Sequence, residues 1–331
     1  MEDLFMRKKF IYLFLLVGII IFALPISISA EEGNTNQNDM ITLDGEVIKF
    51  EDYKDKVKTD TITNIEPTEP KYNNPFETKY LNKNNYKAME NQTIGISNTI
   101  NEIIPFAVIG TDGREKVNDT DVMPYRAISF ISLTFENEGS GTCTGTVVAR
   151  DLILTNAHCL DNEDNGNAVS STVYPAVYDS HYSYGAWQME EAYIPRGWSE
   201  NRDIKYDYAV IKVEPLGDLH VGEITGTLGM TDQNLNSETV SVYGYPGDLM
   251  AEDGQISQWG MSSSVYDWNQ NMVYYTLDTN NGQSGSPVLN TNNEVVGVHR
   301  GSWVDADREP IYNGGPKAND ELITFVLTIA P

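Results

Sequence analysis

Basic residues are scarce in this sequence of 331 residues. Lysine and arginine total 22 against 48 aspartate and glutamate residues, so the formal net charge is -26. A nucleic-acid-binding protein needs a basic face that displaces counterions from phosphates, and a polybasic segment is what attracts a protein to anionic lipid. The charge balance therefore argues against both partners and favours a soluble, strongly acidic protein.

Long apolar runs are also rare, and the clearest one lies near the start. Residues 10–24 are apolar, follow the basic residues at 7–9, and precede Pro25 and a short stretch that ends at Ala30. A basic start, an apolar run of 7–15 residues and a small residue before a polar segment are typical of a secretory signal peptide. A membrane span needs about 20 apolar residues. We therefore expect a signal peptide at 1–30, a secreted, extracellular product and no stable membrane anchor.

The next region, residues 31–106, differs from the rest in texture. It is rich in asparagine, threonine and lysine, contains Pro67, Pro70 and Pro75, and has few apolar runs. A weakly patterned segment between a signal peptide and a globular body predicts a pro-segment. A disordered linker and a small extra domain are the alternatives. The body itself is expected at 107–331.

Short apolar runs bounded by glycine, asparagine, aspartate or proline recur through this body. Such runs predict β-strands, and their spacing is typical of barrels or sandwiches. The sequence therefore predicts an all-β fold. For residues 320–329, a closing helix and a closing strand fit equally well. The expected strands are 127–134, 144–148, 151–155, 208–213, 240–243, 273–277, 288–289 and 295–299.

Three segments carry residues suited to nucleophilic catalysis, and they centre on His158, Asp207 and Ser284. A serine hydroxyl is a weak nucleophile that needs a base within hydrogen-bond reach. Imidazole suits this role near neutral pH, and a carboxylate on its other nitrogen orients it. Gly282 and Ser284 can supply backbone N–H groups to an oxyanion, because the flanking glycines permit the tight turn that this requires.

Each of these residues has a rival or a bland alternative. Asp203 stands four residues before Asp207, but only Asp207 is followed directly by an apolar run. Ser286 is the rival nucleophile, and it also occupies the place where the nucleophile elbow of α/β-hydrolases needs glycine. His181 and His220 lie outside any motif and are expected at the surface.

The three segments resemble the chymotrypsin-like serine peptidases, and within them the bacterial glutamyl endopeptidases of the staphylococcal V8 type and its Bacillus relatives. The resemblance extends over roughly 107–331. The matching stretches are Thr155-Asn156-Ala157-His158-Cys159, Asp207-Tyr208-Ala209-Val210, Gly282-Gln283-Ser284-Gly285-Ser286-Pro287, the run 107–114 and the run 124–128.

This resemblance implies a double β-barrel, with barrels at roughly 107–215 and 216–331 and the active site between them. It implies a secreted serine endopeptidase that acts on proteins or peptides through an acyl-enzyme and uses no cofactor or catalytic metal. It places the nucleophile at Ser284 rather than Ser286. An oxidising compartment together with the family pattern implies a disulfide between Cys143 and Cys159.

The resemblance also implies a specificity pocket. The positions that receive a substrate carboxylate fall on Thr279 and His299, which predicts cleavage after glutamate, with aspartate second. Asp278 supports the alternative of a trypsin-like preference for lysine or arginine, because it stands six residues before Ser284. Arg300 could supply charge instead, although adjacent strand positions face opposite sides.

The same resemblance implies a maturation step. The mature chain is expected to begin at Ala107 or Val108, so the protein is made as a zymogen. Because Phe106 is not acidic, another protease is expected to make the activating cut. Trypsin-type zymogens use an aspartate just before the nucleophile, whereas this chain has Gln283 there.

Three further alternatives remain open at this point. The acidic run 161–166 fails the EF-hand template, so a structural calcium ion is only a weak alternative to a solvated loop. An exfoliative-toxin-like peptidase with narrow specificity would use the same triad. A non-enzymatic adhesin on this scaffold is disfavoured, since every member of the triad is present.

Overall fold

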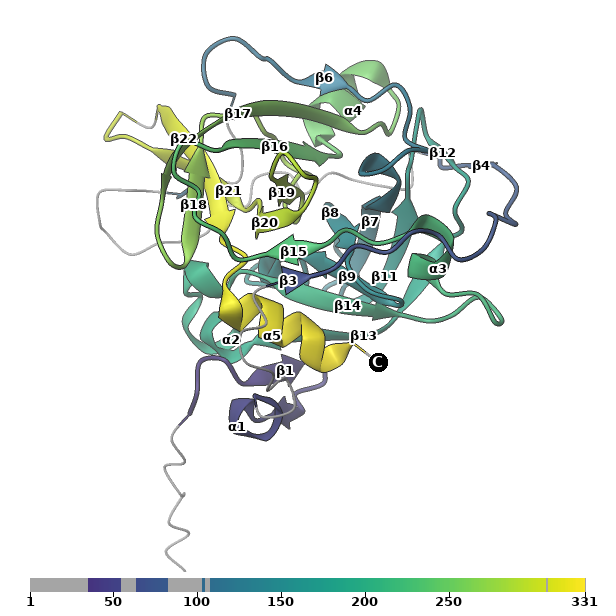
Figure 1. The fold of residues 1–331 in the computed structure, drawn as a ribbon, viewed down its shortest axis with the longest axis horizontal. Helices are drawn as coiled ribbons and strands as arrows, with labels where there is room; N and C mark the ends of the chain where they lie inside the picture. The colour runs from purple at the N-terminus through teal and green to yellow at the C-terminus, as the bar shows by residue number, and fades with distance from the viewer. Residues whose placement is uncertain (1–34, 55–63, 83–102, 105–107, 308, 331) are drawn as a thin grey trace, which may run out of the picture. The chain divides into compact units, whose positions relative to one another are not determined.

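Short apolar runs separated by turn residues produce a mainly β structure (Figure 1). The computed structural model describes residues 35–54, 64–82, 103–104, 108–307 and 309–330. The expected signal peptide at 1–30 lies outside the described residues. From Asn36 onward the chain forms one unit by its internal contacts, and this unit contains both β-sheets.

Six antiparallel strands form the first barrel. They are β7 (Ile128–Phe135), β8 (Ser140–Val147), β9 (Leu152–Thr155), β11 (Gly166–Pro175), β13 (Trp187–Pro195) and β14 (Ala209–Val213). Along the sheet their order is β11, β7, β8, β9, β14, β13, and β13 pairs back onto β11 to close the ring. The interior is apolar, with Ile131, Ile153 and Val210 fully buried. The short β10 (Asp161–Asn162) extends β11.

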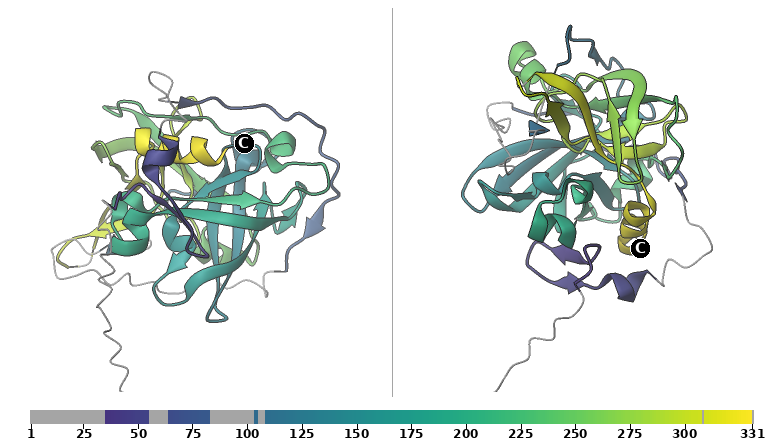
Figure 2. Two further views of the ribbon diagram at one scale, coloured as in Figure 1. Left: turned by 90° about the horizontal axis from the view of Figure 1, so that it is seen from below. Right: turned by 90° about the vertical axis from the view of Figure 1, so that its left-hand side faces the viewer.

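The second sheet follows in the sequence. It contains β15 (Met230–Thr231), β16 (Thr239–Gly244), β17 (Trp259–Trp268), β18 (Met272–Tyr275), β19 (Pro287–Leu289), β20 (Val295–Val298), β21 (Gly301–Val304) and β22 (Pro310–Pro316). The strands β20, β19, β16, β17, β18 and β22 are neighbours in this order. A bridge between Gly297 and Lys317 and the hydrogen bond from Ala318 N to Val296 O (2.9 Å) join the two ends. The expected all-β double-barrel fold is therefore confirmed, and Figure 2 shows the two sheets in teal and in green to yellow.

Described parts of the expected pro-segment contribute strands to both sheets and to a separate two-stranded sheet. These are β1 (Met40–Thr42), which pairs with β13 and with β2 (Val47–Ile48), then β3 (Asn64–Ile65) on β15, β4 (Lys79–Tyr80) on β12 (His181–Tyr182), and β5 (Ile103–Ile104) on β21. Further along the chain, β6 (Glu115–Lys116) pairs with β17. Met40, Tyr53 and Leu81 are buried, so this region shares its core with the body.

The helices are short and lie around the two sheets. The C-terminal stretch left open by the sequence is a helix, α5, and Asn319 caps it by accepting a hydrogen bond from Leu322 N at 3.0 Å. Its Phe325 ring packs edge-on against Tyr208 of the first barrel. No helix among the described residues has the length and apolar character of a membrane span. The α-helices are α1 (Phe50–Tyr53), α2 (Arg196–Asn201), α3 (Val221–Thr225), α4 (Gly247–Asp253) and α5 (Asp320–Ile329), and the 3-10 helices are Tyr125–Ala127, Ala157–Cys159 and Ile204–Tyr206.

Candidate active site

Strand pairing in the first barrel brings His158 and Asp207 together. Strands β9 and β14 are antiparallel, with Thr155 opposite Ala209, so residues just after β9 meet residues just before β14. His158 Nδ1 lies 2.7 Å from Asp207 Oδ2, and the backbone N–H of His158 donates to Oδ1 at 2.9 Å. The side chain of Asn156 donates to the carbonyl oxygen of Asp207 at 2.6 Å. Both the ring and the backbone of His158 are thus fixed by one carboxylate.

The Asp207 carboxylate is fully buried. Burial alone would raise its pKa, but the charge and hydrogen bonds of His158, together with the charge of Arg300, hold the pKa below its ordinary value. The carboxylate therefore stays ionised and accepts the Nδ1–H of His158. This tautomer leaves Nε2 free to act as a base.

Ser284 lies in a glycine-framed turn between β18 and β19. Gly282 and Gly285 adopt φ values of +92° and +85°, and a Cβ at either position would lie within 2.4 Å of a carbonyl oxygen, that of Tyr245 or of Thr144. Only glycine fits both constraints. In the described part of the chain, the N–H groups of Gly282 and Ser284 donate to no protein acceptor, whereas those of Gln283, Gly285 and Ser286 do. Two free N–H groups in such a turn can receive a developing oxyanion.

The turn is tied to the first barrel beside His158. Thr144 of β8 donates its N–H to Ser284 O at 2.8 Å and its hydroxyl to Gly282 O at 2.8 Å. Ser284 O also lies 4.0 Å from the sulfur of Cys159, the residue after His158. The Ser284 hydroxyl has a long contact of 3.5 Å with the carbonyl oxygen of Arg300. Among the described residues, no hydrogen bond joins the Ser284 hydroxyl to His158. Hydrogen bonds between a nucleophile and its base are often long or poorly aligned in unliganded sites and tighten with substrate.

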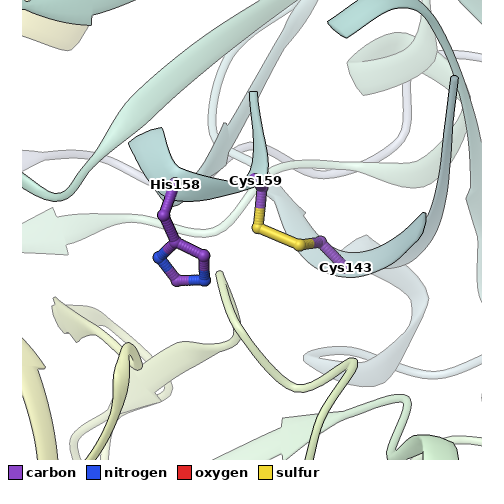
Figure 3. A group of neighbouring side chains, drawn as sticks. All are labelled: Cys143, His158 and Cys159. Carbon is purple, nitrogen blue, oxygen red and sulfur yellow. A yellow bond between two sulfur atoms is a disulfide. The ribbon is translucent and has the colours of Figure 1, made fainter. Parts of the chain in front are cut away.

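The predicted disulfide between Cys143 and Cys159 is confirmed, and it lies next to His158 (Figure 3). These three residues also form a compact histidine–cysteine cluster. Cysteine binds metals as a thiolate, and here both sulfurs are bonded to each other. The disulfide therefore holds the loop that carries His158 in place, and the cluster lacks the donor set of a metal site.

The rival residues have other roles in the structure. Asp203 accepts a hydrogen bond from Lys205 N at 3.3 Å and so caps the 3-10 helix Ile204–Tyr206. His181 is exposed, as expected, whereas His220 is partly buried and pairs with Asp151 at 2.5 Å. Ser286 Oγ is buried, and a Cβ at Gly244 would come within 2.1 Å of it.

Thr279 and His299, the expected pocket residues, are both fully buried. Among the described residues, the Oγ1 atom of Thr279 and the Nε2 atom of His299 have no hydrogen-bond partner. A buried polar atom without a partner costs about 1–3 kcal/mol. A site with two such atoms is suited to a polar ligand that forms hydrogen bonds with both.

The protonation of His299 follows from its surroundings. Burial, and then the charges of His158 and Arg300, lower its pKa to about 3, so the imidazole is neutral near pH 7. Burial raises the pKa of Tyr275 well above its usual value, so the phenol keeps its proton. The Tyr275 hydroxyl lies 2.8 Å from Nδ1 and can donate to it, which leaves an N–H at Nε2. Tyr275 was not predicted from the sequence, since nothing local distinguishes it from other strand tyrosines.

Asp278 is occupied by backbone groups. Its Oδ1 accepts the N–H of Ile109 at 2.7 Å, and its Oδ2 accepts the N–H of Gly113 at 2.7 Å. Gln283 is used in a similar way: its Oε1 accepts the N–H of Asn280 at 2.9 Å and contacts Arg114 at 3.5 Å. Both residues therefore anchor loops, and Asp278 has little capacity left for a lysine or arginine side chain.

The side chain of Arg300 is directed towards Asp207. Its Nε atom lies 2.8 Å from Asp207 Oδ2. Strand alternation predicts that Arg300 and His299 point in opposite directions, but only the fold shows that Asp207 occupies the other side.

In the acidic run at 161–166, Arg202 pairs with Asp161 through contacts of 2.5 and 2.7 Å, and Asn162 accepts nearby backbone N–H groups. These oxygens are already used within the protein.

The geometry and the sequence comparisons agree on the class of protein. Two β-barrels with a histidine–aspartate pair on one and a glycine-framed serine on the other are the architecture of the chymotrypsin-like serine peptidases. A family model described as a trypsin-like peptidase domain matches residues 143–298, which include His158, Asp207 and Ser284.

Individual relatives narrow this class. A glutamyl endopeptidase of Bacillus licheniformis is 35% identical over 187 residues, which cover 55% of this chain and 54% of the relative. An extracellular metalloprotease of Bacillus subtilis is 30% identical over 212 residues, which cover 62% of this chain and 65% of the relative. The chain thus spans between about half and two thirds of the length of these curated relatives.

A solved structure of a Glu endopeptidase in complex with MPD is 39% identical. The match has a TM-score of 0.59 and covers 67% of this chain and 98% of that one. The chain belongs to the glutamyl endopeptidase family of the chymotrypsin-like serine peptidases.

Proposed function

We propose that this protein is a secreted serine endopeptidase that cleaves peptide bonds after glutamate, with aspartate second. The observation that carries the proposal is the hydrogen-bonded pair of His158 and Asp207 beside the glycine-framed turn of Ser284. These residue types in this arrangement support nucleophilic catalysis without a cofactor, as in the relatives of this family.

In the proposed reaction, His158 Nε2 removes the proton from the Ser284 hydroxyl as the oxygen attacks the scissile carbonyl. Asp207 stabilises the imidazolium, and the N–H groups of Gly282 and Ser284 stabilise the oxyanion. His158 then donates the proton to the leaving amine, and an acyl-enzyme forms at Ser284. Water activated by His158 releases the acid product and restores the hydroxyl.

The preference for glutamate rests on Thr279 and His299. The unpartnered Oγ1 and Nε2 atoms provide two donors for a substrate carboxylate in a buried setting, and hydrogen bonds to an ionised group are short and strong. Binding of the substrate carboxylate would also favour protonation of His299, whose imidazole is neutral in the absence of substrate. The Lys/Arg alternative is weaker because both oxygens of Asp278 accept backbone N–H groups.

We also infer that residues 31–106 are a pro-segment, and that its residues 103–104 cover part of the substrate-binding surface. Antiparallel pairing of Ile103–Ile104 with Ser302 and Trp303 supports this, since β21 directly follows His299 and Arg300. An extended substrate that adds a strand to this edge would compete with β5. Cleavage before Ala107 or Val108 by another protease would break the covalent link between this segment and the peptidase body.

A peptide series tests the specificity. Peptides that differ only in the residue before the scissile bond would carry Glu, Asp, Gln, Lys, Arg or Phe, and kcat/KM would be measured for each. We expect Glu to be cut fastest and Asp next. Faster cleavage after Lys or Arg would overturn the pocket assignment and leave the assignment of Ser284 intact. Cleavage of a single protein but of none of these peptides would favour the narrow-specificity alternative.

A further inference from the structure

Two glycines of the body make room for the backbone of the proposed pro-segment. A Cβ at Gly229 would lie 2.7 Å from Ile65 O and 2.8 Å from Pro67 Cδ. The backbone of Gly229 is outside the left-handed region, so its own conformation does not require glycine. A Cβ at Gly226 would lie 2.7 Å from Thr68 O. The body surface is therefore shaped to fit this part of the pro-segment closely.

Hydrogen bonds hold the same stretch in place. Ile65 of β3 pairs with Met230 of β15, and the two strands lie side by side (Figure 1). Further along, Thr227 N donates to Thr68 O at 2.9 Å, and Thr68 N donates to Thr227 Oγ1 at 3.0 Å. Both Thr227 and Met230 are buried. Residues 64–68 thus form the first of two anchors on the body.

The second anchor is an ion pair at the start of α2. Arg196 Nε lies 3.1 Å from Asp39 Oδ2, and the exposed fractions of the two side chains are 9% and 2%. The backbone N–H groups of Arg196 and Gly197 donate to Asp39 O at 2.8 Å and to Gln37 O at 2.9 Å. Pro195 provides no side-chain cap for this helix. The first N–H groups of α2 therefore find their acceptors in the pro-segment.

Separation at this anchor would be costly for both partners. Met40 and Tyr53 of the pro-segment are fully buried, and their apolar surface would meet water. Arg196 would keep only Glu200 of its own helix as an ionic partner, and removal of one partner from a buried ion pair is strongly unfavourable. The same helix carries Trp198, a buried residue whose ring lies 6.3 Å from that of His158.

We infer that the pro-segment stays bound to the body after the maturation cut, so that the active enzyme consists of two chains without a covalent link between them. This inference rests on the maturation cut of the proposed function. Both cysteines belong to the body, so no disulfide joins the chains. The anchors at 36–54 and 64–68 belong to one piece, so dissociation requires that both be released together.

The strand β5 differs from these anchors. Only Ile103 and Ile104 pair with β21, and the cut falls three or four residues after them. An extended substrate can therefore displace β5 from this edge, while the two anchors keep the rest of the piece on the body. Activity and a bound pro-segment are thus compatible.

The test follows the two pieces after the cut. Ser284→Ala, which cannot digest a released piece, is cut before Ala107 or Val108 by a second protease, and the cut is verified by intact mass. Native gel filtration followed by denaturing mass spectrometry shows whether the piece that contains 36–54 elutes with the body. The wild type is cut in the same way, and cleavage of a Glu peptide is measured in each fraction. Intact mass also distinguishes the second N-terminus of a two-chain enzyme from that of an uncut chain.

Three variants of this Ser284→Ala chain probe the anchors. Gly229→Ala places a Cβ against the first anchor, and Asp39→Asn removes the charge that faces Arg196 in the second. Because the anchors are separate, a folding defect in one variant does not remove the test. Gly139→Ala is the matched control, since the nearest neighbours of its Cβ would all be side-chain atoms of Asn165.

We expect the two pieces to elute together and the wild-type activity to elute with both. Gly229→Ala and Asp39→Asn should each raise the dissociation constant of the pro-segment by about tenfold or more, and Gly139→Ala should leave it unchanged. Separation of the pieces, with activity in the body alone, would overturn the inference, and so would unchanged binding in both anchor variants. Pieces that elute together but cleave no Glu peptide would instead overturn the proposed function.

Discussion

The unpartnered hydroxyl of Thr279 leads to a prediction with opposite signs for stability and activity. Thr279→Val replaces the Oγ1 atom with a methyl group of similar size at a fully buried position. An unsatisfied buried hydroxyl costs about 1–3 kcal/mol. We therefore expect the free energy of unfolding of the variant to be about 1 kcal/mol higher than that of the wild type. For a domain of this size, this corresponds to a rise of about 2–4 °C in Tm.

Activity should fall in the same variant. A hydrogen bond to a charged group contributes about 1.5–3 kcal/mol, and each 1.4 kcal/mol is about tenfold in rate or affinity. We therefore expect kcat/KM for a Glu peptide to fall by about 10- to 150-fold. The matched Gln peptide should lose much less, because its amide makes a neutral hydrogen bond.

The control is Thr146→Val. Thr146 is also fully buried, and its Oγ1 has no partner among the described residues, but it lies on β8 within the first barrel. It should gain stability and keep the Glu preference. If Thr279→Val were destabilised and retained the Glu preference, the hydroxyl would be satisfied within the protein and the pocket assignment would fail.

The same geometry leads to three more predictions. Ser284→Ala should fold normally and lose about 10⁶ in kcat, because the triad acts as a unit; a variant that keeps most of its peptidase rate would point to Ser286. The pKa of His299 is about 3 in the folded protein, below that of an unfolded histidine near 6.5. The unfolded state therefore binds more protons between these values, and stability is lost as the pH falls from about 6.5 towards 3. In His299→Gln, the free energy of unfolding obtained from urea curves at several pH values should fall less between about pH 6.5 and 3. An unchanged pH dependence would mean that His299 takes up protons in the folded protein as it does in the unfolded one. N-terminal sequencing of the active enzyme should give Ala107 or Val108, with Glu102 as a site of self-cleavage on the way; full activity in a chain that starts near Glu31 would contradict the pro-segment.

Much of the site could be predicted from the sequence because its chemistry is local. The base sits in a short motif, the nucleophile is framed by glycines, and the orienting aspartate is followed directly by an apolar strand. The predicted run 127–134 became β7, shifted by one residue. The disulfide between Cys143 and Cys159 was predicted from the family pattern together with the secretory compartment.

Other features depend on contacts that no local pattern contains. The carboxylate oxygens of Asp278 accept hydrogen bonds from the backbone N–H groups of Gly113 and Ile109, which precede Asp278 in the chain by 165 and 169 positions. The strand β17 was missed because most of its side chains are not buried, so that pairing with β16 and β18 holds it rather than an apolar face. Strand alternation fixed the direction of Arg300 relative to His299, but the partner it meets came only from the fold.

Cleavage after glutamate by the Ser284 nucleophile can be tested in a single digestion. The most direct measurement is to digest a denatured protein mixture with the matured enzyme and with Ser284→Ala, and to identify every new terminus by mass spectrometry. We expect termini mainly after Glu, fewer after Asp, and none above background with Ser284→Ala. Termini mainly after Lys or Arg, or equal cleavage by Ser284→Ala, would contradict it.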